Sequence, residues 1–427
     1  MTGLCLFVFS IVVWLSRGQY DPTAPLLAAL FVAWVAVTTL NRPVLAGRSI
    51  ARSLVKPFEF LPWLFALLFA IKPDLIYIDP TRSGMLAWLR LLPLVAVTIA
   101  MLPWKGIRQR GFTSRAFVMI VFLIFYASVL VLSPHPQIDV FTSNDAAVGF
   151  FRHGLNPYSQ TYIDIYHGHN DYRPGFLYWP MALYLQTLSK ILFHDVRAIL
   201  VLCWWVAALW VPRRSFLLWL TLPFLAFGFE QAWLDPALSL CAAVSFWALK
   251  RRQWIPLALA IAAAASIKQY GFVIGFFSVI WLWFERPKTE TAKTVGLSAL
   301  IFGAALIPFL VWAPADFLSM TITAHTGALS RPDALNFTAF WMRTTGTDFP
   351  PLAQLAMTAL GFMVGVIHVI RNRSTRGTRV VAEACAMAFG FSFLFGKFGF
   401  CNYHWLLISF WLLSRSDESA DANRLPS

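Results

Sequence analysis

Long apolar runs follow one another along nearly the whole chain and limit the folds available to it. Hydrophobic residues make up 59% of the chain and charged residues only 13%, about half the charge of a soluble domain. Within lipid every backbone polar group must be paired inside the protein, which favours helices for runs of this length. We therefore expect an all-α, polytopic integral membrane protein with about 12–14 transmembrane helices. The runs cover 3–16, 24–41, 58–72, 84–103, 116–133, 176–193, 196–212, 215–230, 232–249, 254–268, 271–285, 294–313, 351–370, 380–396 and 402–414.

Basic residues gather in short loops between the apolar runs and set the expected orientation. Cytoplasmic loops of membrane proteins carry an excess of Lys and Arg, and this assignment gives them about three times as many basic residues as the external loops. The net charge of +14 therefore does not indicate nucleic acid. We predict one polytopic domain over 1–415 in the plasma (inner) membrane, with both termini cytoplasmic, external loops at 134–175 and 314–350, and a polar cytoplasmic tail at 416–427.

One apolar run creates a counting problem for this orientation. Between the first large external loop and the basic pair Arg213/Arg214 the chain must cross an odd number of times, yet two runs lie there, 176–193 and 196–212. We predict that 176–193 is re-entrant or lies along the outer face. The alternative places Arg213 and Arg214 outside, against the rule for basic loops.

The polar stretch 135–175 contains a clear helix signal. Ser143 is a good N-cap, and Gly154 suits the left-handed position that follows a helix. We expect a helix of about ten residues that is amphipathic and lies on the external membrane surface. Asp139 would then precede the helix, and Asp145 would lie in its first turn.

A carboxylate where lipid head groups meet water favours chemistry on a lipid-linked substrate. A sugar on a polyprenyl phosphate has a good leaving group, so transfer needs a base for the acceptor hydroxyl and cations for the departing phosphate. Asp139 is the expected base. Asp145 is a second catalytic candidate, whose alternative role is to interact with the helix dipole. The cationic candidates are Arg152, His153, Arg173, Lys268, Arg331 and Lys397, and the first two also suit a helix C-terminus.

Polar residues interrupt three later apolar runs, and such residues are costly in lipid and therefore functional candidates. All three interruptions fall on the outer side in the expected topology. We predict one external site where they meet the two large loops. Hydrogen bonding between helices, or snorkelling of Lys, is the structural alternative. The interruptions are Glu230, Gln231 and Asp235; Lys268-Gln269-Tyr270; and Lys397, Asn402, Tyr403 and His404.

The large loops supply further candidates. In the second loop, Arg331, Asp333 and Asn336 could contact sugar or phosphate, and Asn336 also begins a glycosylation sequon. The first loop holds a group of residues close enough in sequence to bind a divalent cation, with a hydrated loop as the alternative reading. These residues are Asp164, His167, His169 and Asp171. The sequence makes no cofactor certain, and a divalent cation is the one candidate.

The segments IDVFTSNDAAVGFFRHGLNPYSQTY and FLYWPMALYL resemble the GT-C superfamily of membrane glycosyltransferases. More closely, the chain is similar to the bacterial polyprenol-phosphate mannosyltransferase-like family over roughly 116–414. The matching positions are Asp139, Gly154, Asn156-Pro157-Tyr158 and Tyr178-Trp179-Pro180, where Trp179 departs from the Pro of the pattern. The segments SIKQYGF and FGKFGFCNYHW look like later segments of such proteins.

This resemblance implies a GT-C-like fold and an inverting hexosyltransferase of the cell envelope, with Asp139 as general base. The donor would be a polyprenyl-phosphate sugar, with a mannose-like hexose favoured over a pentose. The acceptor would be a hydroxyl of a lipid, glycan or protein at the outer face of the membrane. The residues expected to contact the donor phosphate or sugar are Arg152, His153, Asn156, Tyr158, Arg173, Lys268, Gln269, Arg331, Lys397, Asn402, Tyr403 and His404.

Two other function classes compete with this reading. A membrane transporter or lipid flippase would have broken helices in repeated halves, and this chain has broken helices but no internal repeat. An acyltransferase or polysaccharide ligase is the second competitor, and acyl transfer would favour His153 over Asp139 as base. The chain has no P-loop or dinucleotide fingerprint, and its loops are too short for a soluble nucleotide-sugar domain. A lipid-linked donor is therefore favoured.

Overall fold

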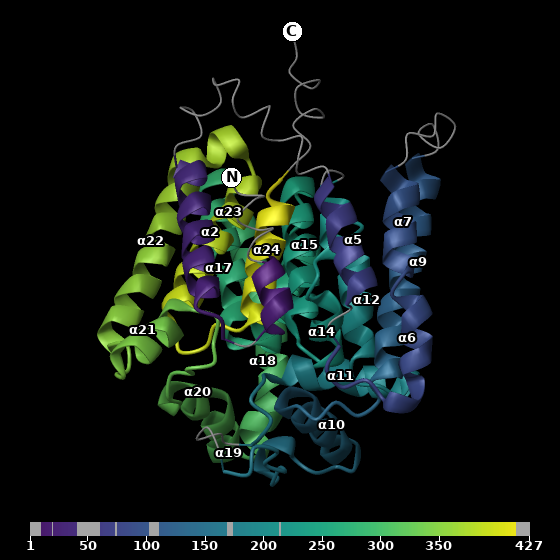
Figure 1. Cartoon of the computed structure of the whole chain (residues 1–427). Helices are drawn as coiled ribbons and strands as arrows, with labels where there is room; N and C mark the ends of the chain where they lie inside the picture. Colours follow the sequence, from purple (N-terminus) through teal and green to yellow (C-terminus); the bar gives the residue numbers. More distant parts are fainter. Residues whose placement is uncertain are drawn as a thin grey trace.

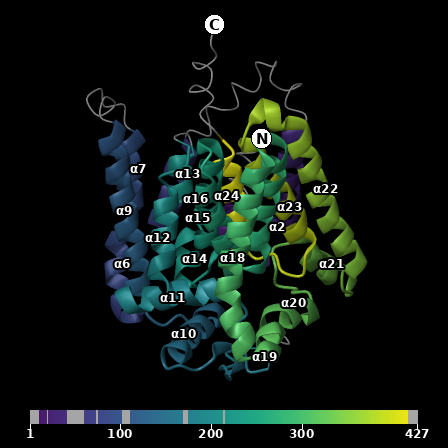
Figure 2. The same ribbon diagram turned by 180° about the vertical axis from the view of Figure 1, so that it is seen from behind.

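The computed structural model describes residues 10–18, 20–40, 60–72, 75–101, 111–168, 174–212 and 215–415. Within these ranges every regular element is a helix, which confirms the all-α prediction. Most helices run side by side in one bundle, and a smaller group lies across its lower end (Figure 1). The view from behind shows the same arrangement (Figure 2). The predicted tail at 416–427 lies outside the described residues.

The first half of the chain supplies mostly short helices around one long one. The longest is α9 (Gly111–Leu132), which leads directly into the polar stretch that holds Asp139. The others are α2 (Thr23–Leu40), α5 (Leu61–Ile71), η2 (Pro80–Arg82), α6 (Ser83–Leu89), α7 (Leu92–Met101), α10 (Asp139–Arg152), η3 (Pro157–Ser159), α11 (Pro180–Phe193) and α12 (Ala198–Ala207).

The second half contains the buried centre of the bundle and its longest outer helices. The elements are α13 (Phe216–Thr221), α14 (Leu225–Glu230), α15 (Asp235–Arg251), α16 (Trp254–Ile267), η5 (Gln269–Gly271), α17 (Phe272–Glu285), α18 (Lys288–Trp312), α19 (Pro314–Leu318), the π-helix η6 (Ser319–Thr323), α20 (Ala324–Gly327), α21 (Phe337–Thr345), α22 (Pro351–Arg376), α23 (Arg379–Phe395) and α24 (Cys401–Leu413).

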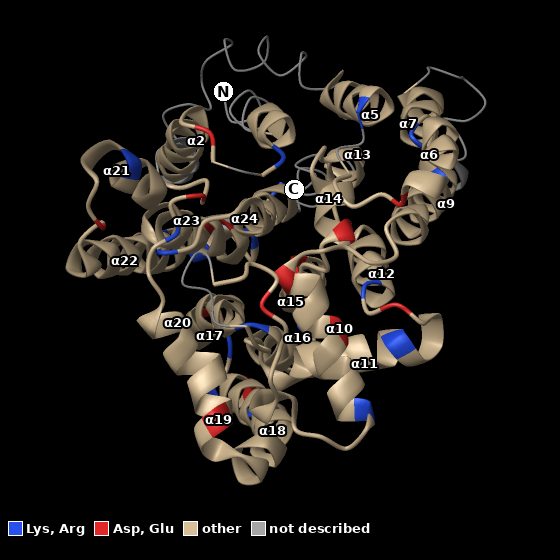
Figure 3. Ribbon diagram, turned by 60° about the horizontal axis from the view of Figure 1, so that its bottom comes forward, with Lys and Arg blue, Asp and Glu red and all other residues tan. Residues whose placement is uncertain are grey.

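Four helical segments are long and apolar enough to cross a membrane: Pro80–Met101, Arg115–Leu132, Lys288–Trp312 and Pro351–Ser374. Fewer than half of the residues in each of these segments are buried inside the protein, whereas most residues of the shorter α15 and α24 are buried. Seen from the lower end, α15, α16 and α24 lie near the centre, with the other helices around them (Figure 3). The larger number of 12–14 crossings stays a prediction.

Aromatic packing fixes the centre of the bundle. Trp204 of α12 stacks on Trp219 of α13 with ring centroids 3.9 Å apart, and Trp405 of α24 packs edge-on against Trp204 at 4.9 Å. All three rings are fully buried. Such pairs add to the free energy gained by burying their large apolar area. They join three helices that are up to 200 residues apart in sequence.

One sequence-based expectation about regular structure was wrong. The run 215–230 is not one helix, because α13 ends at Thr221 and α14 begins at Leu225. Pro223 lies in the gap, and a proline removes a backbone donor and disfavours the helical conformation of the residue before it. The segment 314–350, predicted as an external loop, carries α19, η6, α20 and α21, and its side of the membrane stays a prediction.

Helix α11 occupies the run 176–193 that created the counting problem. It has 14 residues and is therefore about 21 Å long, shorter than the roughly 30 Å of a hydrocarbon core. It packs against α10 at the lower end of the bundle (Figure 1). Helices α16, α17 and α24, in runs predicted to cross, are no longer than α11, so the absence of a crossing at 176–193 stays a prediction. The alternative residues Arg213 and Arg214 lie outside the described part of the chain.

The buried Arg197 ties the lower ends of several helices together. Its guanidinium donates to the carbonyl oxygens of Leu130, Ser133 and Glu230 at 2.8–3.1 Å. It also pairs with Asp195 and lies 4.8 Å from the ring centroid of Phe141 in α10. One side chain thus satisfies carbonyls at the ends of α9 and α14 and fixes the start of α10.

Candidate active site

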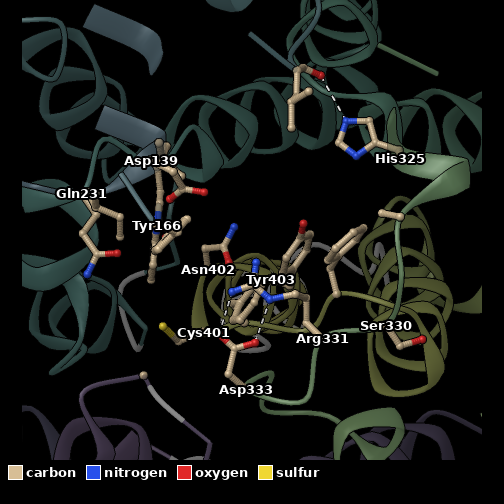
Figure 4. Close-up of a pocket in the computed structure, with 18 of the residues that line it drawn as sticks. Asp139, Tyr166, Gln231, His325, Ser330, Arg331, Asp333, Cys401, Asn402 and Tyr403 are labelled. Atoms are coloured by element: carbon tan, nitrogen blue, oxygen red, sulfur yellow. Dashed lines mark hydrogen bonds and ion pairs between the residues drawn. The ribbon is translucent and has the colours of Figure 1, made fainter. Parts of the chain in front are cut away.

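A cavity of about 1020 Å³ opens where the bundle meets the helices at its lower end. Its walls come from segments spread over almost the whole chain, from Arg17 and Gly18 to Asn402 and Tyr403. Figure 4 shows Asp139, Tyr166 and Gln231 along one side of this space, and His325 and Arg331 on other sides. The cavity is large enough for a sugar phosphate.

Asp139 is the first residue of α10 rather than a residue that precedes the helix. The helix begins four residues earlier than Ser143, the expected N-cap, and Ser143 is buried inside it. The C-terminal end agrees with expectation, because Gly154 has a φ of +73°. The early start brings Asp139 into the first turn, where backbone N–H groups and the helix dipole favour a negative charge.

The environment of Asp139 is that of a carboxylate on the wall of a cavity. Burial raises the pKa of Asp139 above its usual 3.8. Hydrogen bonds from the Val140 N–H and the Tyr166 hydroxyl, together with the positive charge of Arg331, oppose this rise. The net effect is a stronger base than a solvated aspartate, held where a ligand can reach it.

A tight turn brings Tyr166 to Asp139. The Asp164 carboxylate accepts the N–H groups of Tyr166 at 2.8 Å and Gly168 at 2.6 Å. These bonds lower the pKa of Asp164, which lies outside the helices. In the structure Asp164 therefore shapes the loop. No group of three or more metal-ligating side chains occurs within the described residues. His169, Asp171 and Arg173 fall outside them.

Arg331 and His325 line other walls of the cavity. The Arg331 guanidinium makes two parallel bonds to Asp333, at 2.8 and 2.7 Å, and lies 5.4 Å from the Phe400 ring centroid. The His325 Nε2 lies 3.1 Å from the carbonyl oxygen of Leu177. Since a carbonyl only accepts, Nε2 carries the proton and Nδ1 is the basic nitrogen. Burial lowers the pKa of His325, which favours this neutral form.

The break between α16 and η5 places Lys268 in the cavity wall beside α15 and α24. The Lys268 ammonium lies 3.1 Å from Asp235 Oδ2 and 2.8 Å from the Tyr270 hydroxyl. Asn402 also donates to Asp235, at 3.1 Å. Lys268 and Asn402 line the cavity, whereas the carboxylate lies behind them and is fully buried.

Three expected site residues, the catalytic candidate Asp145 and the donor-binding candidates Arg152 and His153, lie outside the cavity lining. Asp145 forms an ion pair with Lys190 of α11 at 2.7 Å, away from the cavity lining. Arg152 and His153 are exposed at the end of α10, and His153 Nδ1 bonds the carbonyl of Gly149 at 2.8 Å. These three take part in the packing and the C-terminal end of α10, and their expected roles in catalysis and donor binding stay predictions.

Other predicted residues stabilise backbone rather than face the cavity. Asn156 Oδ1 accepts the Tyr158 N–H, and the buried Tyr158 hydroxyl donates to the carbonyl of Tyr178. Glu230 accepts the N–H groups of Ile76 and Tyr77, both at 2.8 Å. Four further predicted residues contact backbone carbonyl oxygens. These are Gln269, which donates to Leu177 and Thr321; Lys397, to Thr326 and Ala328; Asn336, to Phe393 and Gly396; and His404, whose Nε2 lies against Leu335.

Of the predicted residues, the cavity lining brings together Asp139, Gln231, Lys268, Arg331, Asp333, Asn402 and Tyr403. The sequence reasoning missed His325 and most of the aromatic wall. A signal existed for some of them, since Tyr166 lies between Asp164 and Gly168, which are typical turn residues, and Tyr178 belongs to the quoted motif. The missed aromatic residues are Tyr77, Tyr166, Tyr178, Phe227, Trp233, Phe398 and Phe400.

No family model, curated protein or solved structure matches this chain.

Proposed function

We propose that the protein is a membrane glycosyltransferase that moves a sugar from a polyprenyl-phosphate donor to an acceptor hydroxyl. The observation that carries this proposal is the position of Asp139. Its carboxylate is on the wall of a large cavity and faces the positive charge of Arg331. Transfer from a lipid phosphate requires this combination of base, cation and enclosed space.

The chemistry follows from the charges around the cavity. Asp139 accepts the proton of the acceptor hydroxyl as its oxygen attacks the anomeric carbon. The bond from that carbon to the phosphate oxygen breaks, and the lipid phosphate leaves with the electron pair. Attack opposite the leaving group inverts the configuration. Arg331 and Lys268 lower the energy of the departing anion because their charges are already in place. Aromatic side chains in the lining suit the apolar faces of a hexose.

The four long apolar helices support a donor that is itself embedded in lipid. The cavity lies at the end of the bundle where the predicted external loops gather, so we propose that it faces the outside or periplasm. The acceptor is then a lipid, glycan or protein hydroxyl of the cell envelope. A mannose-like hexose is the favoured sugar.

The test is transfer of radiolabelled sugar from a panel of polyprenyl-phosphate sugars in proteoliposomes. Asp139→Asn keeps the shape of the side chain and removes the base, so we expect transfer to fall by about 10²- to 10⁴-fold. Asp145→Asn is the matched control, because Asp145 lies on the same helix but pairs with Lys190 outside the cavity. It should retain transfer within about threefold.

Three results would argue against the proposal. Equal loss of transfer in both variants would assign the effect to the folding of α10 rather than to a base. Full transfer by Asp139→Asn would remove Asp139 from the chemistry. No transfer from any donor, together with movement of lipid or solute across the bilayer, would replace the enzyme by a transporter or flippase.

A further inference from the structure

We propose that Lys268 binds an anionic phosphate oxygen of the ligand, and that Asp235, Tyr270 and Asn402 are positioning residues that hold it for this task. This deepens the proposed function and rests on it. The four residues come from α15, the break after α16, η5 and α24.

Asp235 is fully occupied by groups of the protein. It accepts one hydrogen bond from each of three donors: the Tyr270 hydroxyl at 2.7 Å, the Lys268 ammonium at 3.1 Å and the Asn402 amide at 3.1 Å. A buried carboxylate with three donors and one counter-ion is well satisfied. Asp235 therefore acts through its neighbours and does not itself reach the ligand.

The Lys268 ammonium has one N–H group that is not used in the hydrogen bonds to Asp235 and Tyr270. An ammonium has three N–H groups, and two of them point to Asp235 and Tyr270. Among the described residues no further acceptor is bonded to Lys268, and its side chain contributes to the cavity wall. The third N–H is thus the donor available to a ligand in the cavity.

Three tyrosine rings fix where this donor lies. The Lys268 nitrogen is 5.1 Å from the ring centroid of Tyr270, 5.3 Å from that of Tyr178 and 5.7 Å from that of Tyr403. Aromatic faces stabilise a cation in this range. Figure 4 shows Tyr403 beside Asn402 at the cavity wall. The ammonium is held on several sides before any ligand arrives, which reduces the entropy lost on binding.

The chemistry of this donor selects the ligand. A compact ammonium in a buried wall attracts an anionic oxygen and discriminates against a cation or a neutral apolar group. A phosphate offers several such oxygens around one centre, so that Lys268 can bind one oxygen while Arg331 faces the same cavity. This chemistry is shared by a lipid-linked phosphate head group and by free phosphate, and binding measurements separate the two.

The experiment measures binding to the full-length protein in nanodiscs by native mass spectrometry. The probes are a polyprenyl monophosphate, the matching neutral polyprenol, and inorganic phosphate as competitor. The quantity of interest is the ratio of the two lipid affinities, because a folding defect lowers both and leaves the ratio unchanged. No sugar is transferred, so this result is independent of the glycosyltransferase assay.

Two double variants make the comparison. Asp235→Asn with Lys268→Met removes both charges of the cavity pair, since loss of Lys268 alone would leave a buried unpaired carboxylate. Asp145→Asn with Lys190→Met makes the same change at the ion pair outside the cavity. We expect the first to lower the phosphate-to-alcohol affinity ratio by about 10- to 100-fold and the second to leave it within about twofold.

An unchanged ratio in the cavity variant would overturn the proposal, as would an equal fall in both variants. Competition by inorganic phosphate that depends on Lys268 would support the same site with a free anion as its ligand. A Lys268-dependent ratio without competition would support the lipid head group. A Lys268-dependent ratio in a protein that transfers no sugar would keep the phosphate site and remove the glycosyltransferase.

Discussion

Substitution of Arg197 by Lys tests whether one buried side chain holds the lower end of the bundle together. The guanidinium satisfies three carbonyl oxygens and the Asp195 carboxylate. A lysine keeps the charge but lacks the planar fork, so it reaches at most one or two of these acceptors. Two or three buried acceptors then lose a donor, at a cost of about 1 kcal/mol or more each, and about 3 kcal/mol in total.

The expected signal is a lower midpoint of thermal unfolding. For a chain of this length the unfolding entropy is about 0.9 kcal/mol per degree, so 3 kcal/mol corresponds to a decrease of roughly 3–4 °C. Intrinsic tryptophan fluorescence in detergent measures it directly, since Trp204, Trp219 and Trp405 are fully buried in the centre.

Arg82→Lys is the matched control for this measurement. Arg82 also donates to a carbonyl at the end of α9, that of Val131, but its side chain is 40% exposed. We expect its midpoint to change by less than about 1 °C, because water replaces the lost donor. A midpoint for Arg197→Lys as close to wild type as the control would refute the reasoning.

Three further predictions concern other residues. Asp139→Asn should raise the midpoint of thermal unfolding at pH 7. Burial raises the pKa of Asp139, so ionisation of its carboxyl destabilises the folded chain. The difference in midpoint between variant and wild type should vanish below about pH 3.8, where the carboxyl is protonated in the unfolded and the folded chain. Asn336→Ala should cost about 2–3 kcal/mol in denaturant unfolding, because Asn336 caps α21 and donates to the carbonyl oxygens of Phe393 and Gly396. Lys397→Met should speed hydrogen exchange in 319–336 at least about tenfold, because the ammonium holds two carbonyls of that segment; unchanged exchange would contradict this.

The helices of the second half could be predicted closely because their apolar runs end at clear signals. The expected runs 254–268 and 402–414 correspond to Trp254–Ile267 and Cys401–Leu413. Hydrophobicity alone did not reveal the break at Pro223, since both sides of the proline are equally apolar. Ser143 did not mark the start of α10. Its local cap signal was outweighed by the tertiary contacts that bury it, and the helix begins at Asp139.

The candidate site could be predicted only in part, because residue type does not give side-chain direction. Lys268 and Asp235 stand in similar polar breaks, yet one faces the cavity and the other lies behind it. Lys397 is a lysine in a polar break, as Lys268 is, but it holds the backbone of 326–328. These differences depend on packing between helices distant in sequence, which no local pattern encodes.

The cavity wall combines segments from both ends of the described chain, and this determines when the cavity can be completed during synthesis. Gly18, with a φ of +73°, leaves no room for a β-carbon beside Cys401, so the earliest described turn packs against the last helix. A membrane chain is inserted from its N-terminus, and Asp235 gains its donor Asn402 only after α24 has been inserted. The hydrogen-bond network around Asp235 therefore stays incomplete until α24 has packed against α15. A chain that stops before α24 leaves the buried Asp235 carboxylate one donor short, at a cost of about 1–3 kcal/mol.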